Sequence, residues 1–276
     1  MQSEQIGTRR KEAFGQGWQE HFVDVERASK SLSVGSAVSQ SLSYVTLSNF
    51  ASIDECSVLQ ASAMEIKDSA MKYEDNSIIN THVLGATEAA HHNCTRYSVA
   101  GLLDAHSKDV SSAFLHRLLG FLEGDGCWGG HGKIEEMSQL AELIFGSRCD
   151  LKKLKVTWYS EPDEQGTMHP EPKVNIYSDG GFFASHEDGM HPTLLVVLDD
   201  SFEGGGTAFY REEEDDLDAD AEEKNDDKTI VPDSVATPCA GTGIIWGANL
   251  KHMALPITKG TRSVYVGSFD LNQDDS

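Results

Sequence analysis

Cysteine is scarce and scattered in this sequence of 276 residues. Only five cysteines are present, and no two of them form a CxxC pair. A disulfide scaffold needs an even, closely spaced set, and a zinc knuckle needs paired cysteines. Both classes are therefore excluded, and we expect buried or free thiols. The five are Cys56, Cys94, Cys127, Cys149 and Cys239.

Long apolar runs are also missing. No stretch approaches the roughly 20 apolar residues of a membrane-spanning helix, and the first residues contain no apolar core of a signal peptide. We therefore expect a cytoplasmic protein that does not associate with a membrane.

Basic residues are few compared with acidic ones. Lys and Arg total 22 against 45 Asp and Glu, which gives a formal charge of −23. A surface of this sign repels nucleic acids and anionic membranes, and it favours a cation or a basic substrate. Nucleic-acid binding is excluded on this ground.

What is present is a chain with 39% hydrophobic residues, enough to bury one sizeable core. Residues 1–40 are polar, and we expect them to be loosely ordered or wrapped over the body. Residues 41–150 are predicted to be a mainly helical support region, and residues 151–272 the catalytic core. Residues 41–272 are expected to fold as one unit.

Three apolar series with helical spacing support the middle region. A capping box, Ser52 to Glu55, opens the first, and Gly146 is a plausible C-cap for the third. The series are Cys56, Leu59, Ala63 and Ile66; Val110, Phe114, Leu118 and Leu122; and Ile134, Met137, Leu140 and Ile144.

From about residue 153 the apolar period changes to two, which predicts strands. Many short strands between Gly, Pro and Asp turns indicate an α+β protein whose core is a jelly-roll, or double-stranded β-helix, supported by N-terminal helices. The acidic segment 212–228 is expected to be a solvated loop. The strands are expected at Leu154 to Trp158, Val174 to Ile176, Thr193 to Leu198, Ala208 to Tyr210, Gly243 to Trp246 and Ser263 to Phe269.

Three residues of this core are candidate metal ligands. His186 and Asp188 stand two apart, which places both side chains on one face of a strand. A third ligand should come from a distant strand, and His252, after the Gly243 to Trp246 strand, suits that role. Two His and one carboxylate occupy one face of an octahedron, which is typical of non-haem Fe(II) sites that bind a co-substrate and O₂ together.

A buried cation is expected near this metal site. Arg262 begins a predicted strand that could direct its guanidinium into the barrel. A buried Arg needs an anionic partner, and a dicarboxylate co-substrate supplies one through a two-pronged contact.

Four ordered motifs between residues 153 and 271 resemble the 2-oxoglutarate-dependent dioxygenases of the prolyl 4-hydroxylase and lysyl hydroxylase superfamily. They are Tyr177-x-x-Gly180-Gly181 with His186-x-Asp188, Phe202-Glu203-Gly204-Gly205-Gly206-Thr207-Ala208-Phe209, Pro238-Cys239-Ala240-Gly241, and His252-x-x-x-Pro256-Ile257-x-x-Gly260-x-Arg262.

The resemblance implies a role for each candidate. His186, Asp188 and His252 would hold Fe(II), Tyr177 would hydrogen-bond 2-oxoglutarate, and Arg262 would pair with its distal carboxylate. The implied reaction hydroxylates a C–H bond with O₂ and converts 2-oxoglutarate to succinate and CO₂. Ascorbate is a candidate reductant.

Three functions remain open at this point. The substrate is a prolyl or lysyl side chain of a polypeptide, or it is a free amino acid or specialised metabolite that is hydroxylated, desaturated or cyclised. A metabolite enzyme should show a second buried cation for a substrate carboxylate, and the available cations are Arg96, Arg117 and Arg148. The third alternative, of another class, is a non-catalytic jelly-roll binding module.

Two further sets of residues are interpreted without a catalytic role. His191 could contact a substrate at the barrel mouth, but a loop position is favoured. Phe209 and Trp246 lie in apolar strands, where aromatic residues more often belong to the core.

Overall fold

The fold comes from a computed structural model, which describes residues 18–22, 43–73, 91–99, 105–123, 154–158, 160–162, 168–170, 172–188, 192–210, 231–247 and 250–273. The described elements run in chain order as β1 (Trp18–Phe22), β2 (Ser43–Leu47), α3 (Ile53–Tyr73), β3 (His91–Ser98), α6 (Ala105–Glu123), β4 (Leu154–Trp158), β5 (Ser160–Pro162), β6 (Met168–Pro170), β7 (Lys173–His186), β8 (Thr193–Val197), β9 (Glu203–Gly204), β10 (Thr207–Tyr210), β11 (Ser234–Ala236), β12 (Gly243–Trp246), β13 (Lys251–Ala254), β14 (Ile257–Lys259) and β15 (Arg262–Gln273).

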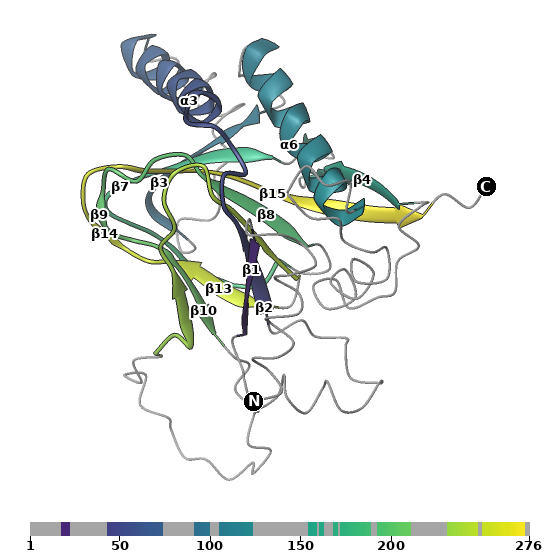
Figure 1. The fold of residues 1–276 in the computed structure, drawn as a ribbon. Helices are drawn as coiled ribbons and strands as arrows, with labels where there is room; N and C mark the ends of the chain where they lie inside the picture. The colour runs from purple at the N-terminus through teal and green to yellow at the C-terminus, as the bar shows by residue number, and fades with distance from the viewer. Residues whose placement is uncertain are drawn as a thin grey trace.

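Most of these strands form one curled sheet of eleven strands (Figure 1). Its order is β1-β2-β12-β8-β15-β7-β13-β10-β11, with β3 added beside β7 and β4 beside β15. All pairings among the described strands are antiparallel, and the central neighbours, from β2–β12 to β13–β10, are distant in sequence, as in a jelly-roll. The predicted jelly-roll core is confirmed.

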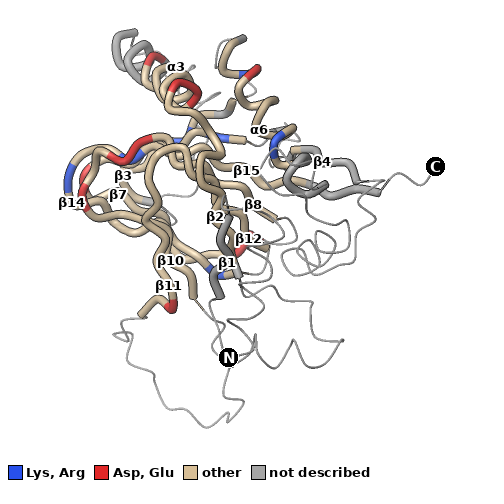
Figure 2. Tube along the Cα trace, viewed as in Figure 1, with Lys and Arg blue, Asp and Glu red and all other residues tan. Residues whose placement is uncertain are grey.

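Strand β8 explains why the sheet has two apolar faces. All five residues of its sequence TLLVV are buried, so the strand is covered on both sides. Because side chains alternate, the residues of β8 face two different clusters of buried apolar side chains. Leu194 and Val196 belong to an outer cluster, and Leu195 and Val197 belong to an inner cluster. Few charged residues lie along the central strands (Figure 2), which agrees with burial on both sides.

The outer cluster lies under the two helices, which cover one side of the sheet (Figure 1). Leu59 of α3 and Phe114 of α6 are fully buried against it. The Phe114 ring meets the Tyr265 ring of β15 edge-on, with centroids 5.1 Å apart. The helices thus pack on the outer face of the sheet, and the inner cluster lies on its concave face.

The predicted capping box begins α3. The Glu55 amide donates to Ser52 Oγ at 3.2 Å, and the Ser52 amide donates to Glu55 Oε2 at 2.9 Å. This reciprocal pair satisfies two amides that have no partner within the helix. The helices predicted around Cys56 and Val110 are confirmed as α3 and α6.

The prediction for the first half of the chain was incomplete. Residues 41–150 also contribute β2 and β3, which join the sheet beside β12 and β7. Residues 18–22, within the segment expected to be loosely ordered or wrapped over the body, form β1 on the edge of β2. The third predicted helix, around residues 134–144, and the acidic segment 212–228 lie outside the described residues.

No described helix is long and apolar enough to span a bilayer. The described cysteines, Cys56, Cys94 and Cys239, are all free thiols, as the sequence predicted.

Candidate metal and co-substrate site

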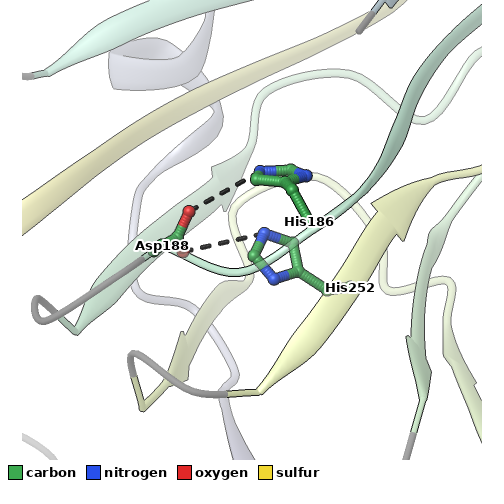
Figure 3. Close-up of side chains that lie close together, drawn as sticks. All are labelled: His186, Asp188 and His252. Atoms are coloured by element: carbon green, nitrogen blue, oxygen red, sulfur yellow. Dashed lines mark ion pairs between the residues drawn. The ribbon is translucent and has the colours of Figure 1, made fainter. Parts of the chain in front are cut away.

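The three candidate ligands come together on the concave side of the sheet (Figure 3). His186 is the last residue of β7, Asp188 follows two positions later, and His252 lies on β13. Strands β7 and β13 pair, with His186 directly opposite His252. The short spacing in sequence and this cross-strand register therefore bring both imidazoles and the carboxylate to one point.

The distances fit a metal ion. Nε2 of His186 lies 3.6 Å from Asp188 Oδ1, and Nε2 of His252 lies 3.6 Å from Asp188 Oδ2. With metal–ligand bonds of about 2.1 Å, ligand atoms at right angles stand about 3 Å apart. A small inward movement of the three side chains would close the set on an ion.

Both imidazoles are oriented as metal ligands. Nδ1 of His186 lies 2.8 Å from the Ala184 carbonyl, and Nδ1 of His252 lies 2.8 Å from the Leu250 carbonyl. A carbonyl only accepts, so each Nδ1 carries the proton, and each Nε2 directs its lone pair toward the space that it shares with the Asp188 carboxylate, where a metal ion would lie. Burial lowers the pKa of His252, which favours the neutral form that binds metal.

The Asp188 carboxylate is fixed by two donors. Trp246 Nε1 on β12 donates to Oδ2 at 2.9 Å, and the Thr193 hydroxyl on β8 donates to the same oxygen at 2.5 Å. Oδ1 accepts no hydrogen bond from the described residues and faces His186. Such donors orient a ligating carboxylate and tune its affinity.

A bulge in β7 separates the metal end of the strand from its other end. Cys94 of β3 pairs with Tyr177, whereas His92, only two residues earlier, pairs with Phe182. The extra residues of β7 include Gly180, whose φ is +75°, and Gly181, where a Cβ would lie 2.6 Å from the Ser178 carbonyl oxygen. The two glycines thus set where Tyr177 lies relative to His186.

Arg262 and Tyr177 line the same cavity as the three candidate ligands. They pair across β15 and β7, and the guanidinium carbon lies 5.5 Å from the Tyr177 ring centre. Arg262 is 2% exposed, and its Nη2 donates to Thr207 Oγ1 at 3.1 Å. No carboxylate of the described residues pairs with it, and burial lowers its pKa. This guanidinium is prepared for an anionic ligand.

Tyr177 supplies a neutral donor beside Arg262. Burial raises its pKa well above the ordinary value of 10, and the neighbouring Cys94 adds to this effect while Arg262 opposes it. The phenol therefore keeps its proton at neutral pH and can donate a hydrogen bond to an anion held by Arg262.

A second guanidinium lines the same cavity. Arg96 on β3 pairs with Asn175 of β7, and its Nε donates to Asn175 Oδ1 at 3.4 Å. Its guanidinium carbon lies 5.4 Å from the centre of the Phe183 ring, and that ring lies 4.7 Å from the His186 ring. The sequence named Arg96 only as an available cation, and the structure places it near the metal ligands.

The remaining candidates lie elsewhere. Arg117 pairs with Glu55 on the helical side of the sheet, with Nη1 and Oε2 2.9 Å apart. Arg148 and His191 lie outside the described residues. Phe209 is fully buried behind the site, where it stacks on Tyr44 with ring centres 4.2 Å apart. Its predicted core position is confirmed.

Sequence reasoning missed the roles of Trp246 and Thr193. Trp246 was assigned to the core, and it is 1% exposed, but it also donates to Asp188. The one available signal was its place in an apolar strand that precedes the His252 ligand. That signal does not reveal the direction of the indole N–H.

No protein-family model matches the sequence, and no curated protein matches it either. Solved structures with a similar fold include a Trichoplax adhaerens prolyl hydroxylase in complex with a hypoxia inducible factor peptide (10% identity, 89% of this chain and 93% of that chain, TM-score 0.46). Another is a Pseudomonas putida prolyl-4-hydroxylase (14% identity, 87% of this chain and 95% of that chain, TM-score 0.45). A third is the α-ketoglutarate-dependent carbocyclase SnoK from nogalamycin biosynthesis (15% identity, 85% of this chain and 82% of that chain, TM-score 0.47). Similarity this low says nothing about the reaction, which has to follow from the residues of the site.

Proposed function

We propose that this chain is an Fe(II)- and 2-oxoglutarate-dependent dioxygenase that hydroxylates an unactivated C–H bond. The observation that carries the proposal is the arrangement of His186, Asp188 and His252 around one point, in the same cavity as the buried, carboxylate-free Arg262. A metal site and an anion site in one cavity suit a ligand that chelates the metal and carries a second, separate carboxylate.

The donor set favours iron over a structural zinc ion. Two neutral imidazoles and one carboxylate provide three ligands from one side, and the described residues offer no fourth. A structural zinc site is closed by four protein ligands, whereas a facial triad leaves positions for exogenous ligands. His186, Asp188 and His252 would hold the iron.

Arg262 and Tyr177 are assigned to 2-oxoglutarate. The guanidinium would form a two-pronged pair with the distal carboxylate, and the Tyr177 hydroxyl would donate to the same group. Because Arg262 is already buried, the dianion would neutralise a charge that otherwise remains unpaired in the cavity. The 2-oxo acid end would then point toward the two histidines.

When bound, iron, 2-oxoglutarate and O₂ supply the oxidising chemistry, in which one oxygen atom enters succinate and the other enters the substrate as CO₂ is released. The residues of this chain position the parts. Trp246 and Thr193 hold the carboxylate, the two backbone carbonyls fix the imidazoles, and the apolar wall of Leu195 and Val264 limits the access of water.

Two substrate classes are compatible with this function. One is a prolyl or lysyl side chain in a polypeptide, and the other is an amino-acid-derived small molecule. The reaction at the metal would be the same for both, so the metal and co-substrate assignments can be tested before the substrate is known.

The test is the anaerobic addition of 2-oxoglutarate to the protein reconstituted with Fe(II). We expect a visible metal-to-ligand charge-transfer band, which should be missing from His186→Ala. Lys259→Gln is a matched control, because Lys259 is exposed and pairs with Glu203 in the separate two-stranded sheet of β9 and β14. Succinate release in air with ascorbate would then serve to screen substrates.

The result that contradicts the proposal is correctly folded wild-type protein that binds no Fe(II) and gives no band. The chain would then be better described as a non-catalytic jelly-roll binding module. Circular dichroism and a melting curve on each variant establish that folding is retained.

A further inference from the structure

The cavity contains more positive charge than the proposed co-substrate can neutralise. Its lining includes two guanidinium groups, Arg96 and Arg262, but only one carboxylate, Asp188. Iron and the two Arg residues would carry four positive charges, and Asp188 with 2-oxoglutarate three negative ones. An unbalanced charge in a partly buried cavity is costly, so one further anionic group is expected.

This excess stands out because the chain as a whole is strongly acidic, with a formal charge of −23. Nevertheless, no carboxylate of the described residues pairs with Arg96. Its contacts there are the hydrogen bond to Asn175 and the stacking on Phe183. Stacking on an aromatic face orients a guanidinium but leaves its charge unneutralised. The outer nitrogens of the group remain available for a ligand.

Register places Arg96 beside the co-substrate site and not within it. On β7, Tyr177 pairs with Arg262 and Cys94, while Asn175, two residues away on the same face, pairs with Val264 and Arg96. The two guanidinium groups therefore belong to different rows of side chains. Arg262 is 2% exposed and Arg96 is half-buried, so Arg96 is the one that a second ligand can reach.

The path from Arg96 to the metal site is short. The guanidinium carbon lies 5.4 Å from the Phe183 ring centre, which lies 4.7 Å from the His186 ring centre. Arg96 is therefore no more than about 10 Å from that imidazole. A carboxylate paired with the guanidinium lies about 4 Å from it. In a ligand bound this way, a carbon beside His186 would be only a few bonds from the carboxylate.

From these observations we propose that Arg96 binds the carboxylate of the primary substrate, and that this substrate is a small organic acid of amino-acid size. The inference rests on the proposed dioxygenase function and selects the small-molecule substrate class over a polypeptide side chain. Phe183 positions the guanidinium, and the stem of the acid lies between Arg96 and His186.

The experiment compares matched pairs of ligands: N-acetylated amino acids from glycine to tryptophan, and the primary amide of each. Binding is measured by calorimetry on protein loaded with Mn(II) and 2-oxoglutarate, so that no turnover occurs. A charge-assisted hydrogen bond contributes about 1.5–3 kcal/mol, so the wild type should prefer at least one acid to its amide by at least about tenfold.

Substitutions of Arg96 separate charge from shape. In Arg96→Gln the preference should fall to within about twofold, while Arg96→Lys keeps the charge and should retain part of it. Lys259→Gln is again the control with an exposed cation removed, and it should keep the full preference. Melting curves establish that the loss of the Phe183 contact has not unfolded the variants.

Three outcomes would overturn the inference. In the first, the wild type binds no acid of the panel more tightly than its amide. In the second, Arg96→Gln keeps the wild-type preference for the acid. In the third, Arg96→Gln weakens the binding of 2-oxoglutarate as strongly as it weakens the binding of the acid. The last result would assign Arg96 to the co-substrate. Failure of the proposed function is distinguishable, because the wild type would then give no charge-transfer band with Fe(II) and 2-oxoglutarate.

Discussion

Removing the indole donor from Asp188 should weaken metal binding without removing a metal ligand. Trp246→Phe deletes the Nε1–H that lies 2.9 Å from Asp188 Oδ2 and leaves the Thr193 hydroxyl as the remaining donor to that oxygen among the described residues. A hydrogen bond to a charged group contributes about 1.5–3 kcal/mol. Since 1.4 kcal/mol corresponds to a factor of ten, the dissociation constant should rise by roughly 10–100-fold.

An independent expectation gives the same range, because substitutions of groups that orient metal ligands typically cost roughly 10–100-fold in affinity. The assay is calorimetric titration of the metal-free protein with Mn(II), repeated anaerobically with Fe(II). Thr193→Val removes the other donor at nearly constant volume and should cost a similar factor. The double variant should lose more than either single one.

Volume is the main confounding effect, since Trp246 is 1% exposed and a smaller ring leaves a gap. Tyr44→Phe is the matched control. It removes a hydroxyl that bonds Ser234 at 2.9 Å from a ring in the same inner cluster, but it does not touch Asp188. Metal affinity within about twofold of wild type in both Trp246→Phe and Thr193→Val would refute the assignment.

Two further predictions concern the scaffold. Partial burial raises the pKa of Glu55, but the hydrogen bonds from Arg117 and Ser52, with the positive charge of Arg117, together outweigh it and hold this pKa below its ordinary value of 4.5. Glu55→Gln should therefore be less stable than wild type at pH 7, and the difference should shrink as pH falls through the lowered pKa. Melting curves from pH 7 to pH 3 test this, and a difference that does not change with pH argues against it. Gly181→Ala places a Cβ 2.6 Å and 2.7 Å from the Ser178 and Asn93 carbonyl oxygens, so the β7 bulge must shift, at a cost of roughly 1–3 kcal/mol. Denaturant unfolding beside Ser185→Ala, an exposed position of the same strand, measures this cost, and a loss below about 0.5 kcal/mol would show that the bulge adapts.

The sequence predicted those parts of the fold that depend on short-range patterns. The period of two in apolar residues identified β4, short apolar runs identified β8 and β12, and the capping box identified the start of α3. The HxD spacing placed His186 and Asp188 together because two residues on a strand return to the same face. His252 and Arg262 were named from their positions next to predicted strands and from the motif that resembles the dioxygenase family.

Strand β3 was missed for a physical reason. Its sequence, HHNCTRYS, has no apolar alternation, since Arg96, on the same face as Cys94, lines the cavity and does not pack into the core. What holds it in place is pairing with β7, about 80 positions later in the chain, and no local pattern encodes such a register. The donors to Asp188 were missed similarly, because a buried Trp in an apolar strand has the same sequence pattern whether or not its N–H has a partner.

The same residues also argue against a purely structural role for the cavity. A buried guanidinium without a carboxylate partner lowers stability, and an apolar side chain at position 262 would remove that cost. The three metal-ligand candidates are likewise oriented by carbonyls, an indole and a hydroxyl that core packing does not require. A chain selected only to fold would gain by losing these groups, so the cavity is built for a ligand. Because the triad would close only one side of an ion, the remaining positions would be free for the ligands of the proposed reaction.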